Sequence, residues 1–128
     1  MHDAADYIDE IKSLLISAPF VLDVEILREE AIGNDGLYRL RAKLADGTEL
    51  QMFERFSLVE HISIVVGKYS FHWQQGNGTL LKRWDNAPHH PEISTFPHHI
   101  HDGREENVMS GAPMNGAQIL KLIENMLL

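Results

Sequence analysis

The sequence predicts an α+β fold in which roughly five antiparallel strands form a meander and an N-terminal and a C-terminal helix pack on one face of the sheet. Three observations indicate this fold. Both ends of the chain carry apolar residues at helical spacing, the middle alternates between apolar and polar residues, and short turns separate the alternating runs. Because the chain has 128 residues, 44% of them hydrophobic, we expect residues 1–128 to form a single domain.

The first predicted helix begins after Asp3, a residue type that often caps helices. Acidic residues follow in its early turns, where the helix dipole favours them. Apolar side chains share one face at Tyr7, Ile8, Ile11, Leu14 and Leu15. We expect this helix to end before Pro19, because proline disrupts the helical hydrogen-bond pattern.

The strands are predicted from alternation, which places every second side chain on the same face of a sheet. In the first strand, the apolar face is predicted to contain Phe20, Leu22, Val24 and Ile26. Glycine-containing turns at 33–36, 46–47 and 76–78 separate the later strands. The predicted strands cover residues 20–26, 38–44, 48–56, 64–74 and 80–84, with a bend or short helical turn at 57–62.

The C-terminal helix has the clearest periodicity in the chain. Its apolar residues are Ile119, Leu122, Ile123, Met126 and Leu127, and Asn115 is a suitable cap. This pattern favours packing in the core over exposure for a partner. Between the last strand and this helix no period is sustained, so residues 86–114 are predicted to be a histidine- and proline-rich loop, of a length typical of functional loops.

Several classes of protein are disfavoured by composition. The chain has no cysteine, so disulfides and thiolate ligands are excluded and a metal site would use nitrogen and oxygen ligands. No apolar stretch is long enough to cross a bilayer, and residues 1–10 lack the cations of a targeting signal, so we expect a cytoplasmic protein without a membrane partner. The net charge of −8 opposes nucleic-acid binding on average.

The segment from Arg83 to His101 departs from this acidic average. Residues 82–104 carry equal numbers of acidic and basic side chains and hold most of the histidines of the chain. Three prolines, Pro88, Pro91 and Pro97, restrict the backbone there, which favours a fixed arrangement of the imidazoles. If several histidines were protonated, this segment would be a cationic surface.

Three interpretations of this segment stay open. Histidines with Asp85 or Glu92 could bind a divalent metal, since a His-x-His pair on a strand directs both rings to one side. Histidines near Lys82, Arg83 and Asp85 could act as general acid and base in phosphodiester cleavage without a metal. They could also stabilise the loop. The candidate site residues are Arg83, Asp85, His89, His90, His98, His99 and His101.

The same segment resembles the TumE family, toxin components of type II toxin–antitoxin pairs. The resemblance is carried by Tyr69-Ser70-Phe71-His72-Trp73-Gln74, by Arg83-Trp84-Asp85-Asn86-Ala87-Pro88-His89-His90-Pro91-Glu92, and by Thr95-Phe96-Pro97-His98-His99 with His101. It implies a prokaryotic protein neutralised by direct contact with a cognate antitoxin. It supplies no catalytic residues, so the candidates above rest on their chemistry alone.

The leading hypothesis is therefore a toxin that acts on RNA, with histidines exchanging protons and Arg83 or Lys82 holding phosphate. One alternative is a non-catalytic module that binds the antitoxin or another protein. Another is a metal-dependent hydrolase whose metal is held by histidines. The sequence leaves open whether the chain forms a homodimer.

Overall fold

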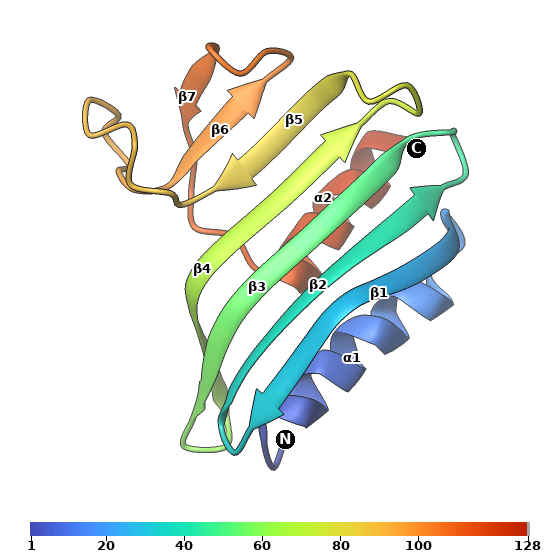
Figure 1. Cartoon of the computed structure of the whole chain (residues 1–128), viewed down its shortest axis with the longest axis vertical. Helices are drawn as coiled ribbons and strands as arrows, with labels where there is room; N and C mark the ends of the chain where they lie inside the picture. The colour runs from blue at the N-terminus through green and yellow to red at the C-terminus, as the bar shows by residue number, and fades with distance from the viewer. Residues whose placement is uncertain (128) are drawn as a thin grey trace.

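A computed structural model describes residues 1–127, which form one antiparallel sheet with two helices on the same face (Figure 1). The predicted α+β class is confirmed, but the predicted number of about five strands is wrong, because the sheet has seven strands in sequence order. The strands are β1 Val21–Ile32, β2 Asp35–Leu44, β3 Glu49–Val59, β4 Ser63–Gln74, β5 Leu80–Asp85, β6 His99–Asp102 and β7 Val108–Ser110. The helices are α1 Ala4–Ser17 and α2 Gly116–Leu127.

Both helices begin at the predicted caps. The Asp3 side chain accepts a hydrogen bond from the amide of Asp6, and the Asn115 side chain accepts one from the amide of Gln118. The Gln118 side chain in turn accepts from the amide of Asn115, so this cap is reciprocal. No helix within residues 1–127 is long and apolar enough to span a membrane.

The hydrophobic core lies between the helices and the sheet. It is built from alternate residues of β2, β3 and β4, which meet the apolar faces of both helices. Its largest fully buried apolar side chains are Tyr38, Phe71, Ile8, Ile11, Leu15, Leu40, Leu44, Leu50, Met52, Ile119 and Ile123. The opposite face of the sheet carries no helix, so polar side chains are free to gather there (Figure 1).

A carboxylate, Glu54, lies inside this core and is 0% exposed. It accepts hydrogen bonds from the hydroxyls of Tyr7 and Tyr38 and from the amide of Gly116, at the start of α2. Burial raises the pKa of Glu54, while these hydrogen bonds oppose the rise. Gly116 fits because an added Cβ would lie 2.6 Å from Glu54 Oε1. The network thus joins both helices to the sheet.

The apolar face predicted for the first strand is wrong in part. Leu22 is 69% exposed and has no partner in the register, whereas Val21 and Val24 pack against the core. Ile26 is 40% exposed but lies opposite Leu40, on the predicted face. The register of β1 against β2 shifts between Val21 and Asp23, which places both Val21 and Val24 on the helix side and leaves Leu22 at the irregularity.

The predicted loop at 86–114 is also wrong in part, because it contains β6 and β7. These strands extend the sheet beyond β5, and the segment between β5 and β6 projects from its edge (Figure 1). Four and three residues are too few to show a period in the sequence. Conversely, residues 57–59 belong to β3, and the turn follows at Glu60 and His61, which both have positive φ.

Candidate functional site

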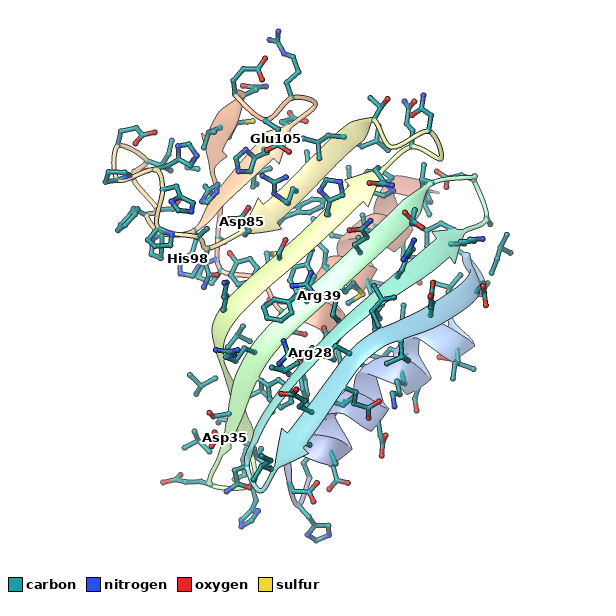
Figure 2. All side chains as sticks on the ribbon, in the orientation of Figure 1. Arg28, Asp35, Arg39, Asp85, His98 and Glu105 are labelled. Carbon is teal, nitrogen blue, oxygen red and sulfur yellow. The ribbon has the colours of Figure 1, made fainter. Side chains whose placement is uncertain are left out.

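Pairing between β5 and β6 brings four of the candidate residues together. Asp85 lies opposite His99 and Arg83 lies opposite His101, so all four side chains share one face of the sheet. This is the face without helices, because Trp84 on the alternate position belongs to the helix-side core. Figure 2, which looks onto the helix-free face, shows Asp85 at the end of β5.

Asp85 is the buried centre of this group. Its Oδ2 accepts a hydrogen bond from Arg83 Nε at 3.0 Å, and its Oδ1 accepts one from the amide of Ala87 at 3.0 Å. The same Oδ1 lies 2.9 Å from His99 Nε2, and Oδ2 lies 3.6 Å from His101 Nε2. The carboxylate is therefore fixed in orientation and directed at two imidazoles.

The two imidazoles are oriented by backbone carbonyls. His99 Nδ1 lies 2.8 Å from the carbonyl of Pro97, and His101 Nδ1 lies 2.7 Å from the carbonyl of Glu105. Because a carbonyl only accepts, each Nδ1 donates, and in the neutral ring each Nε2 then carries a lone pair. The two Nε2 atoms face each other at 3.1 Å.

A third imidazole comes from the segment between β5 and β6. The half-buried His90 packs edge-on against His99 and His101, with ring centroids 5.0 and 5.7 Å away. One nitrogen from each of His90, His99 and His101 can be chosen so that all lie within 4.8 Å of one another. His90 Nδ1 also lies 3.1 Å from a carboxylate oxygen of Glu92. We call His90, His99, His101 and Asp85 the histidine cluster.

Arg83 is held by carboxylates on both sides. In addition to Asp85, its two terminal nitrogens donate to the two oxygens of Glu105 at 2.6 Å each. These contacts raise the pKa of Arg83 and lower the pKa of Glu105. Arg83 thus positions Asp85, and its donors are engaged within the protein. Glu105 lies on the turn after β6, beside the cluster (Figure 2).

The remaining predicted residues lie outside the cluster. His98 pairs with the Tyr69 hydroxyl at 3.1 Å and stacks on that ring, which belongs to the helix-side core. His89 is exposed on the projecting segment. Lys82 lies over Trp84 and therefore on the helix side, away from Arg83. The structure thus gathers Arg83, Asp85, His90, His99 and His101 but neither His89 nor His98.

Sequence reasoning missed a second feature, a set of cations on the helix-free face. Strand register places seven of the 11 lysines and arginines on this face: Arg28, Arg39, Arg41, Lys43, Arg55, Lys68 and Arg83. Arg28 and Arg41 are paired with acids, mostly from the edge strand β1. Within residues 1–127, four of the seven are exposed and form no ion pair: Arg39, Lys43, Arg55 and Lys68. Lys43 lies opposite two acids, Asp23 and Glu49. We call the other three residues, Arg39, Arg55 and Lys68, the cationic patch.

A row of paired residues connects the patch to the cluster. Arg39 lies opposite Phe53, Phe53 opposite Ser70, Ser70 opposite Asp85, and Asp85 opposite His99. The Arg39 guanidinium covers the Phe53 ring at 4.5 Å. With about 4.8 Å between neighbouring strands, Phe53 and His99 are roughly 14 Å apart along the row. Arg39 and Asp85 lie on the same side of the sheet in Figure 2.

Comparison with protein families matches residues 11–127 to the family described as Toxin TumE. The chain belongs to the TumE family. The match extends well beyond the segment that carried the resemblance and includes the second half of α1, the whole sheet and α2. Membership of a toxin family implies an antitoxin partner. No curated protein and no solved structure matches the chain.

Proposed function

We propose that this TumE-family chain is the toxin of a type II pair and that it cleaves RNA at the histidine cluster. The observation that carries the proposal is the row from Arg39 to His99, which connects the cationic patch to the imidazole nitrogens of the histidine cluster on one face of the sheet. A phosphodiester strand needs both: cations attract its backbone, and a basic nitrogen or a bound cation activates the attacking hydroxyl or water.

The cationic patch accounts for how an acidic protein could bind RNA. The histidine segment alone is locally neutral in its lysines, arginines and acids, but the patch adds three exposed cations on adjacent strands. The guanidinium of Arg39, supported by Phe53, offers a plane on which an unpaired base can stack. We therefore propose single-stranded RNA as the substrate, lying across β2–β5 toward β6.

The first test compares two double variants in growing bacteria and in vitro. We expect the wild-type chain to stop growth and to cut RNA when purified, and His99→Ala with His101→Ala to do neither. The cleavage rate should fall at least about 100-fold, the scale of a lost acid–base or metal-activating group. The matched control is His61→Ala with His89→Ala, which removes two exposed histidines outside the cluster and should leave both activities unchanged.

Circular dichroism and the unfolding midpoint of each variant establish that it is folded before its activity is compared. Equal growth inhibition by the folded cluster variant would overturn the role of the cluster. Purified wild-type protein that leaves RNA intact but binds its cognate antitoxin would favour the alternative of a non-catalytic binding module.

A further inference from the structure

We infer that His90, His99 and His101 form a binding site for a single zinc-class divalent ion, with Asp85 beside it. The two strand histidines supply the starting observation: their Nε2 atoms are 3.1 Å apart although each ring donates its Nδ1 proton elsewhere. Two neutral rings in this state turn lone pairs toward each other, and such an arrangement is stabilised by a metal cation or by a shared proton between them.

Asp85 strengthens the same conclusion. Its Oδ1 is 2.9 Å from His99 Nε2, so a carboxylate oxygen lies beside the two ring nitrogens and adds negative charge to the site. The side chains of His99, His101 and Asp85 are 2%, 6% and 9% exposed. Burial makes mutual repulsion between these acceptors costly unless positive charge is placed among them.

The distances fit a transition metal. Two imidazole nitrogens bound to tetrahedral zinc at about 2.1 Å are about 3.4 Å apart, close to the separation of the two Nε2 atoms. His90 completes a set of three ligand atoms that all lie within 4.8 Å of one another, so a small movement of its loop would bring it to bonding distance. Three neutral imidazoles favour zinc and its neighbours over magnesium or calcium, which prefer oxygen ligands.

The surroundings resemble the outer shell of a metal site. His99 and His101 donate their far nitrogens to carbonyls, and His90 Nδ1 meets the Glu92 carboxylate, contacts that orient imidazole ligands. Arg83 and the Ala87 amide fix Asp85. Three protein ligands leave a fourth position for water or substrate. That the ion acts on RNA rests on the proposed function, whereas its binding does not.

The experiment uses the full chain expressed without a polyhistidine tag, stripped with a chelator and titrated with Zn²⁺ by calorimetry. We expect one ion per chain and an unfolding temperature that rises with zinc concentration, because an ion bound only by the folded state stabilises it. Co²⁺ should give the visible absorption of a four-coordinate site. His90→Ala should weaken zinc binding by about 10-fold or more, the scale of a disrupted ligand shell.

His90→Ala is the decisive variant because His90 lies on a loop and its removal leaves β5 and β6 intact. His98→Ala is the matched control and should bind zinc as the wild-type chain does. Absence of stoichiometric binding, or equal zinc affinity in His90→Ala, would overturn the site; the first result would leave a proton shared between His99 and His101. RNA cleavage by the stripped protein would refute a role for the ion while leaving the proposed function intact. Tight zinc binding without RNA cleavage would support the metal site and contradict the proposed function.

Discussion

Two buried carboxylates, Glu54 and Asp85, lie on opposite faces of the same sheet and are held in different ways. Glu54 receives hydrogen bonds from two tyrosine hydroxyls and one backbone amide, all neutral donors. Asp85 receives one from a guanidinium and one from an amide, and it also faces two imidazole nitrogens. Both carboxylates are almost completely buried. Of the two, only Asp85 lies beside imidazole nitrogens that could bind a metal ion.

This difference separates a structural role from a chemical one. The partners of Glu54 come from α1, β2 and the start of α2, so the carboxylate connects three elements and its donors are satisfied. Asp85 lies where β5 pairs with β6, and the Nε2 atoms of His99 and His101 lie 2.9 and 3.6 Å from its oxygens. We therefore expect changes at Glu54 to act on stability and changes at Asp85 to act on activity.

The largest expected effect is on stability. Glu54→Leu would leave the hydroxyls of Tyr7 and Tyr38 and the amide of Gly116 buried without an acceptor. At about 1–3 kcal/mol for each of these three unsatisfied groups, the free energy of unfolding should fall by roughly 3–9 kcal/mol. Urea denaturation measures this change. Tyr7→Phe removes one donor and leaves the carboxylate partnered, so it should cost only about 1 kcal/mol. If Glu54→Leu lowered the free energy of unfolding by less than about 1 kcal/mol, the structural role of Glu54 would be contradicted.

The next effect is on activity. Asp85→Asn keeps the volume of the side chain but removes the negative charge beside His99 and His101. We expect RNA cleavage and growth inhibition to fall by about 100-fold, equivalent to about 2.7 kcal/mol in the activation barrier. The free energy of unfolding should change far less than for Glu54→Leu. Single-turnover cleavage assays and urea denaturation of the same preparation measure both quantities. Full activity in a folded Asp85→Asn protein would remove the distinction between the two carboxylates.

A smaller effect should follow from the cationic patch. Arg39→Gln, Arg55→Gln and Lys68→Gln together remove three charges on the path to the cluster. On single strands each phosphate contact contributes about 0.7 to the slope of log affinity against log salt, so this slope should decrease by about 2. Lys121→Gln is the control, because Lys121 lies on the exposed side of α2. Fluorescence anisotropy with labelled RNA at several salt concentrations measures the slope. Equal slopes for the triple variant and the control would place RNA elsewhere.

The parts of this arrangement that could be predicted from sequence depend on local signals. Asp3, Pro19 and Asn115 mark helix ends through interactions within a few residues of the chain. The spacing of His99 and His101 likewise predicted two rings on one side, because alternation is a local property of a strand.

The parts that could not be predicted depend on pairing between strands. Arg39, Phe53, Ser70 and Asp85 are distant in sequence, and only the register of β2 to β5 aligns them in one row. The face of β1 was predicted wrongly at Leu22 for the same reason, since a register shift cannot be read from alternation. The approach of His90 to the cluster depends on the fold of the segment between β5 and β6, which shows no period.

The smallest expected effect is a dependence of stability on pH that originates at Glu54. Burial raises its folded-state pKa above the ordinary value, so the folded protein keeps a proton that the unfolded chain releases. The stabilisation from that proton is fully present below the unfolded-state pKa and is lost as pH rises through the folded-state pKa. Glu54→Gln, which is neutral at every pH, should therefore gain stability relative to the wild-type chain as pH rises above the ordinary glutamate pKa of about 4.5.

The opposite contribution from Glu105, whose pKa Arg83 lowers, is present in both proteins and cancels in the difference between them. Urea denaturation of the two proteins at several pH values measures that difference. A constant difference over this range would mean that Glu54 titrates alike in the folded and unfolded chains, as a solvated carboxyl does. The electrostatic distinction between Glu54 in the core and Asp85 on the helix-free face would then be unsupported.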